Sequence, residues 1–261
     1  MRRVVEHNRN ATLHPDELVP GLVGKENQDS SLLRVKRELR RLGLLPFTDP
    51  TSPSLVSIVA GARVSGSWWG HPAGQAIYRV GEALESDPDT LHLRLWRGKQ
   101  TLVDRRLWPA LERVGSARAT WQVTGLSAAG RRLLAQVDQA GLLRSGRLGS
   151  DISSRSRGSP LALRDLGERL LVLTRSVHTP SGAHALEAEG WSAWRTRVGS
   201  PRYRGSVSSA RLQLEEAARQ LTPGIDPRPL FPWGQSRVRR KRAPLPARWP
   251  PAAASSRPSN S

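Results

Sequence analysis

Apolar positions recur at helical spacing near the start of the chain. Between Ser31 and Leu44, apolar residues at positions 32, 35, 39 and 42 recur in steps of three and four, and basic residues occupy the opposite face. This spacing predicts an amphipathic helix, which Gly43 and Pro46 end. Its apolar face packs on the core, or its basic face contacts phosphates. Residues 1–30 have no sustained period and predict a flexible leader.

The next stretch predicts a helix, a second helix, a hairpin and a third helix. Ser54 caps the first helix, Pro72 begins the second, and alternating leucines on both sides of Gly98 form the hairpin. The third helix begins at or just before Pro109. We take residues 31–120 as one module. The buried stripe of the second helix is assigned to Ile77, Tyr78, Val80, Ala83 and Leu84.

Residues 121–199 predict a second module. Ser127 caps a helix that Gly141 ends, and Leu142-Leu143 resembles a short strand. A further helix follows Ser159-Pro160, and a hairpin turns at residues 179–182. With an irregular helix in residues 145–159, this is the winged-helix order of helix, strand, helix, helix and hairpin. The predicted fold class is α+β, with tandem winged-helix-like modules and disordered N- and C-terminal extensions.

The last part of the chain divides in two. Residues 200–222 predict one more helix. Residues 223–261 are rich in proline, arginine and serine without periodicity, which predicts a disordered basic tail. The tail is a solvated extension, or it adds electrostatic attraction to a nucleic acid.

Composition points to a polyanionic partner. The net charge of the 261 residues is +19, and the chain contains no cysteine, which excludes disulfides and thiolate metal sites. Residues 54–199 hold 20 basic and 12 acidic residues, so the core itself is basic. DNA is the expected partner and RNA the alternative. Only four of the 41 basic residues are lysine, so a GC-rich genome is a competing explanation of the charge.

No apolar run reaches the about 18 residues of a membrane helix. We therefore expect no membrane partner and a cytoplasmic location, either free or associated with the nucleoid. The sequence contains no phosphate-binding glycine loop, nucleophile elbow or zinc signature. No cofactor or metal site is predicted, and no catalytic residue is assigned.

Eight residues are candidates for nucleic-acid contact. Trp68 and Trp69 are adjacent, and Trp69 stacks on a base or, with its neighbour, fills the core. His71 follows them and contacts a phosphate, a base or the nearby backbone. The other candidates lie on the second module's last helix and wing, or end the first hairpin: Arg164, Arg169, Arg175, His178, Arg105 and Arg106. Arg105 and Arg106 form a patch or pair with Glu112 and Asp104.

Four blocks of sequence resemble a group of small bacterial proteins related to the AlkZ DNA glycosylases. The blocks are Ser65-Gly66-Ser67-Trp68-Trp69-Gly70-His71-Pro72, Arg106-Leu107-Trp108-Pro109-Ala110-Leu111, Trp121-Gln122 with Gly125-Leu126-Ser127, and Val177-His178-Thr179-Pro180-Ser181-Gly182-Ala183-His184. They cover roughly residues 45–196. The resemblance implies winged-helix repeats and, in the glycosylases, removal of alkylated or crosslinked bases.

Those glycosylases carry a catalytic Gln-x-Gln or Gln-x-Asp, whose letters Gln136-Val137-Asp138 match. Side chains two apart on a helix diverge by about 200°, so we assign this tripeptide no catalytic role. The leading hypothesis is a non-enzymatic winged-helix DNA-binding protein linked to repair or regulation. The alternatives are a glycosylase-like enzyme and a protein–protein interaction module.

Overall fold

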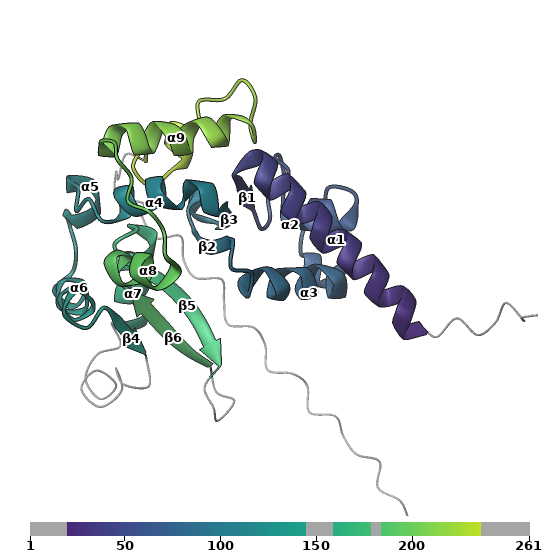
Figure 1. Ribbon diagram of the computed structural model, residues 1–261, viewed down its shortest axis with the longest axis horizontal. Helices are drawn as coiled ribbons and strands as arrows, with labels where there is room; N and C mark the ends of the chain where they lie inside the picture. Colours follow the sequence, from purple (N-terminus) through teal and green to yellow (C-terminus); the bar gives the residue numbers. More distant parts are fainter. Residues whose placement is uncertain (1–19, 145–158, 179–183, 236–261) are drawn as a thin grey trace, which may run out of the picture.

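Helices and strands alternate in the computed structural model, which describes residues 20–144, 159–178 and 184–235. The fold is therefore mixed α and β, as the sequence predicts. Two three-stranded antiparallel sheets are formed within the described residues. Each sheet belongs to a unit in which a helix precedes the first strand and a hairpin supplies the other two (Figure 1).

The N-terminal unit, residues 20–104, has the order helix, strand, helix, helix, strand, strand. Its elements are α1 (Pro20–Leu42), β1 (Leu44–Pro46), α2 (Leu55–Ala60), α3 (Gly74–Glu85), β2 (Thr90–Arg94) and β3 (Gln100–Asp104). Strand β3 lies between β1 and β2 and is antiparallel to both. The strand that closes the hairpin is therefore the central one.

The C-terminal unit, residues 128–189, repeats this arrangement over its described residues. Its elements are α6 (Ala128–Ala140), β4 (Leu142–Arg144), α7 (Ser159–Glu168), β5 (Leu173–His178) and β6 (His184–Glu189). Strand β6 lies between β4 and β5 and is antiparallel to both. The irregular helix expected in residues 145–159 falls almost wholly outside the described residues.

Further helices connect the two units and cover them. They are η1 (Trp68–Gly70), η2 (Trp96–Gly98), η3 (Arg105–Leu107), α4 (Trp108–Gly115), α5 (Thr120–Val123), α8 (Trp191–Val198), α9 (Val207–Arg219) and η4 (Arg228–Leu230). Helix α9 packs along α4 (Figure 1). Trp191 and Trp194 on α8 are buried in the larger hydrophobic cluster, together with α1, α3 and α4. Helix α8 therefore joins the C-terminal unit to the core of the N-terminal one.

Local signals in the sequence set several of these boundaries. Ser54 and Ser57 form a reciprocal capping box at the start of α2. The Ser127 hydroxyl accepts a hydrogen bond from the Gly130 amide at the start of α6. Gly141, with a φ of 74°, ends α6 in a conformation that glycine adopts without strain. These helix starts and stops were all predicted from the sequence.

The prediction of a disordered tail is wrong for residues 223–235. The Phe231 ring is fully buried and meets the Trp96 ring edge-on at 5.5 Å. Trp233 stacks on Phe231 at 4.5 Å, and its indole N–H donates to Glu215 on α9 at 2.7 Å. These rings bury enough apolar surface to fix a proline-rich segment that has no periodicity.

Two other boundaries differ from the sequence predictions. Helix α1 begins at Pro20, inside the stretch assigned to the leader, and residues 1–19 lie outside the described residues. Strand β5 begins at Leu173 rather than Leu171, because Leu170 adopts a φ of 54° and turns the chain after α7. The rest of the tail, residues 236–261, also lies outside the described residues.

Candidate nucleic-acid interface

The arginines predicted on the last helix of the C-terminal unit are engaged by acidic side chains. Arg164 donates from Nε to Glu168 one turn later at 2.7 Å. Arg169 is only 5% exposed and pairs with Asp165 at 2.7 Å. Its other donors reach the carbonyl oxygens of Gln122 and Thr124. The prediction of phosphate contact is therefore wrong for Arg169, which ties α7 to the segment around α5.

The predicted wing arginine is also held in place. Arg175 on β5 and Arg144 on β4 both donate to the fully buried Glu187 carboxylate on β6. Burial raises the pKa of Glu187, but hydrogen bonds from the two guanidinium groups outweigh it and the net pKa is lowered. The three side chains cross-link all three strands. His178 ends β5, and its side chain lies outside what the structure describes.

The patch proposed at the end of the first hairpin is largely neutralised. Arg106 pairs with Asp104 at 3.7 Å, which is one of the two alternatives that the sequence left open. Arg105 pairs with Asp89 at 3.3 Å and lies over the Trp108 ring. The Glu112 carboxylate was a candidate partner of these arginines. It instead pairs with Arg195 on α8 at 3.6 Å.

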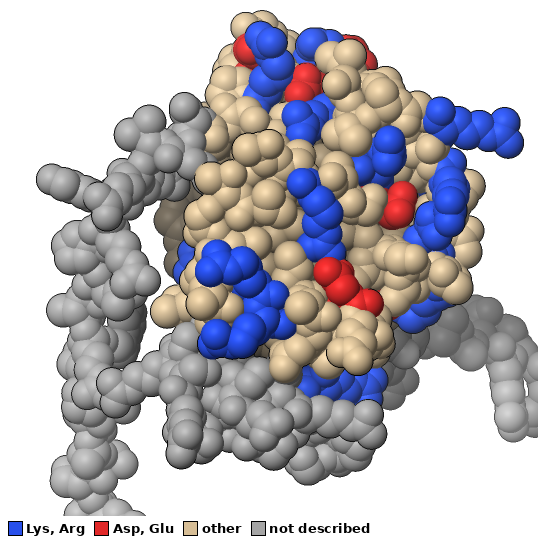
Figure 2. Space-filling model, turned by 90° about the vertical axis from the view of Figure 1, so that its left-hand side faces the viewer, with Lys and Arg blue, Asp and Glu red and all other residues tan. Residues whose placement is uncertain are grey.

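Positive charge without an acidic partner lies on other elements. Within the described residues, seven exposed arginines make neither an ion pair nor a side-chain hydrogen bond: Arg37, Arg40, Arg79, Arg113, Arg132, Arg202 and Arg204. Figure 2 views the molecule from the side of α5 and α6, where basic side chains outnumber acidic ones and lie in separate groups. The positive charge on this face is therefore spread over several patches.

An aromatic step is exposed at the start of α3. The indole of Trp69 is 67% exposed and stacks on Trp68 with the ring centroids 4.0 Å apart. The Tyr78 ring, 49% exposed, lies 6.0 Å from the Trp69 ring and is tilted by 39° to it. Trp68 in turn contacts Phe47 at 5.7 Å, which anchors the step to the core. Trp69 is thus held by other rings while two thirds of its surface stays exposed to solvent.

The backbone around this step explains its position. Gly66, with a φ of 80°, precedes the short helix η1, and α3 follows within a few residues. A Cβ atom at Gly74 would lie 3.0 Å from the carbonyl oxygens of both Trp68 and Trp69. Only glycine lets α3 approach the tryptophan backbone this closely. His71 Nδ1 accepts a hydrogen bond from the Ala73 amide at 3.1 Å, so His71 serves the local turn.

The charge along α3 is divided. Arg79 is exposed beside Tyr78 in the first half of the helix, whereas Glu82 and Glu85 lie in the second half. Burial and the nearby Glu82 charge raise the pKa of Glu85. An anion therefore meets attraction near the aromatic step and repulsion toward the helix C-terminus.

Sequence reasoning missed two members of this surface. Tyr78 was assigned to the buried stripe, but the stripe is Ile77, Val80, Gly81 and Leu84, and Tyr78 points outward. Arg79 was not considered at all. The signal was available, because positions 77, 80, 81 and 84 already fill one face of a helix and leave 78 and 79 outside it.

The remaining candidate chemistry is sparse. Gln136 and Asp138 are exposed on α6, one on each side of the buried Val137. Asp138 pairs with Arg118. No group of three or more metal-ligating side chains occurs among the described residues. Likewise, no helix in the described part of the chain is long and apolar enough to span a bilayer. No family model, curated protein or solved structure matches the chain.

Proposed function

We propose that this chain is a nucleic-acid-binding protein built from two winged-helix units. The order of helices and strands in the N-terminal unit, and the central position of the last strand of each sheet, support this proposal. In such a unit the third helix is the element that approaches the nucleic acid. That helix is α3 in the N-terminal unit, and we infer that α7 is its counterpart in the C-terminal unit because it too directly precedes the hairpin.

We further propose that the N-terminal half of α3 is the contact surface. One observation carries this assignment: the 67% exposure of Trp69, which stacks on Trp68 and has the Tyr78 ring 6.0 Å away. Stacking of one base on such a ring contributes about 1–3 kcal/mol. Arg79 adds a guanidinium without an acidic partner for the adjacent phosphate. DNA is the leading partner, and RNA is distinguished by the same assay.

Fluorescence anisotropy with labelled duplex DNA, single-stranded DNA and single-stranded RNA tests the proposal, at low and at physiological salt. Trp69→Ala is expected to weaken binding by about 5- to 150-fold, the equivalent of the lost stacking. Leu212→Ala is the matched control, because Leu212 is also exposed but lies on α9. No binding of any probe by the wild-type chain at low salt would refute the function.

A second pair of variants tests the position of the surface. Arg79→Ala and Arg204→Ala each remove one unpaired guanidinium, but Arg204 lies in the loop between α8 and α9. Arg79→Ala is expected to weaken binding and to lower the salt slope by about one. Equal losses for both variants would show that only the total charge matters, and would refute the assignment to α3.

A further inference from the structure

A pocket of about 230 Å³ lies where the two units meet. Strand β2 of the N-terminal unit forms one wall, and α7, β5 and β6 of the C-terminal unit form the others. It is lined by Leu93, Arg94, Pro160, Leu163, Arg164, Gly167, Glu168, Val172, Thr174 and Leu186. Helix α7 therefore turns part of its surface toward the N-terminal unit.

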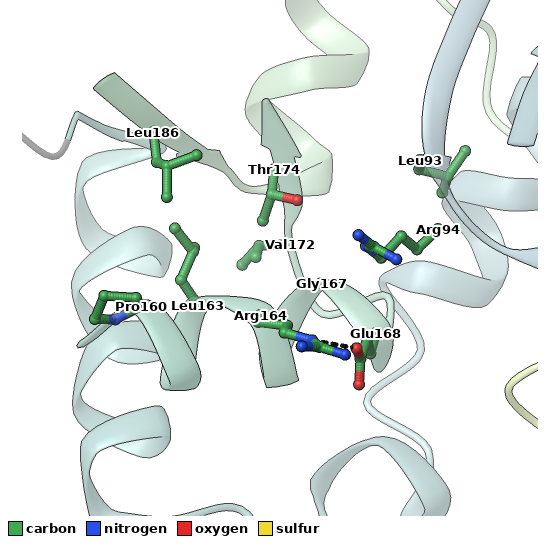
Figure 3. Close-up of a pocket in the computed structure, with 10 residues that line it drawn as sticks. All are labelled: Leu93, Arg94, Pro160, Leu163, Arg164, Gly167, Glu168, Val172, Thr174 and Leu186. Carbon is green, nitrogen blue, oxygen red and sulfur yellow. Dashed lines mark hydrogen bonds and ion pairs between the residues drawn. The ribbon is translucent and has the colours of Figure 1, made fainter. Parts of the chain in front are cut away.

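The lining separates into an apolar end and a charged end. Figure 3 shows Pro160, Leu163 and Leu186 together on one side of the pocket. Arg94 reaches in from β2 on the other side, above the ion pair of Arg164 with Glu168. A ligand that fills this space needs a compact apolar body and one polar head.

The charged end favours an anion. It carries two guanidinium groups and one carboxylate, so its formal charge is positive. Within the described residues, Arg94 makes a single weak hydrogen bond, from Nη1 to the Gly98 carbonyl oxygen at 3.3 Å. Arg164 engages Glu168 through Nε, and no hydrogen bond from its Nη groups occurs among the described residues. Both side chains retain donors for a carboxylate, whose two oxygens match this fork geometry.

The size of the pocket limits the ligand. A cavity of about 150 Å³ holds benzene, so 230 Å³ accommodates one ring with a small substituent. We propose that this pocket binds a small aromatic monocarboxylate, with its ring on the leucines and its carboxylate between Arg94 and Arg164. Such a ligand contacts both units at once. The proposal stands independently of nucleic-acid binding.

Isothermal titration of the full chain with benzoate tests the proposal, with benzamide as the neutral probe of the same shape. Benzoate is expected to bind and to raise the thermal unfolding midpoint, because it binds the folded state only. Benzamide is expected to bind at least about ten-fold more weakly, since it cannot accept two charge-assisted hydrogen bonds. Equal binding of the two probes, or no benzoate binding, would overturn the proposal.

Two variants with opposite expected effects, together with one control variant, locate the site. Arg94→Gln is expected to weaken benzoate binding by about ten-fold or more, whereas Glu168→Gln is expected to strengthen it by removing the competing carboxylate. Arg204→Gln removes the same charge at a distant loop and serves as the control. Both pocket variants change side chains outside the hydrophobic clusters, so their folding is preserved. Loss of affinity in Glu168→Gln, or an equal loss in Arg204→Gln, would place the anion elsewhere.

Discussion

His92 makes the stability of the protein depend on pH in a range where the carboxylates contribute little. It lies in the middle of β2, paired with Leu102 on β3, and solvent reaches neither ring nitrogen. Among the described residues neither nitrogen makes a hydrogen bond of good geometry, although the Leu84 carbonyl lies near enough to favour the protonated ring. Burial lowers the pKa of His92 to about 4, and the nearby Leu84 carbonyl and Asp87 carboxylate offset it only in part. In the folded chain His92 therefore stays neutral until the pH falls to about 4.

The size of the effect follows from the two pKa values. In the unfolded chain His92 takes up a proton near its usual 6.5, and in the folded chain only near 4. Between these values the unfolded state binds more protons, so the free energy of unfolding falls as pH falls. For a single group with these pKa values, the loss between pH 7 and pH 5 is about 2 kcal/mol. Below pH 4 both states are protonated and the loss is complete.

The assay is urea unfolding at pH 7 and pH 5, followed by tryptophan fluorescence, for the wild-type chain and His92→Phe. The phenyl ring is also flat but cannot take up a proton, so the variant is expected to lose about 2 kcal/mol less on acidification. Asp49, Asp87 and Glu187 have lowered pKa values and lose their contributions only at more acidic pH. An equal loss in both proteins would refute the reasoning.

Two further predictions concern packing. Gly115→Ala is expected to destabilise the chain by about 1–3 kcal/mol, although alanine favours helix, because the new methyl group would lie 2.2 Å from the Trp191 ring. Gly130→Ala, which meets nothing closer than 3.3 Å, is the control in thermal unfolding, and a stabilised Gly115→Ala would contradict the packing of α4 on α8. Phe231→Ala is expected to cost about 3–5 kcal/mol, measured by urea unfolding. An unchanged urea midpoint would show that residues 223–235 do not pack on the core and would support the disordered tail predicted from the sequence.

Local signals predicted most of the elements, whereas long-range contacts decided the candidate site. Serine caps, a stop at Gly141 and leucine alternation act within one turn or one strand, so they are visible in the sequence. The acidic and carbonyl partners of the arginines are not visible in the sequence. Arg144 and Glu187 are separated by 43 residues, and Arg169 reaches carbonyl groups more than 40 residues away. The arginines predicted to form a basic face are instead engaged by these partners, which only the assembled fold brings close to them.

Aromatic residues show the same division. Trp191 and Trp194 lie three residues apart, which is the spacing of one helix face, and both are buried. For Trp68 and Trp69 the sequence left core packing and stacking open, and the fold places one ring partly inside and the other outside. Adjacent residues on a short helix point in different directions, so a pair of tryptophans cannot both enter the same core. A single exposed partner is the expected result.

The two units differ in what they leave open, although their strands follow the same order. Helix α7 faces β2 across the pocket. Arg164 on this helix pairs with Glu168, and Arg169, just after it, pairs with Asp165. Helix α3 packs against β2 from the N-terminal unit and keeps its aromatic step exposed. Strand β2 thus contacts both α3 and α7. Arg94, which we propose as a ligand contact, and α3, which we propose as the nucleic-acid contact, therefore meet on the same strand.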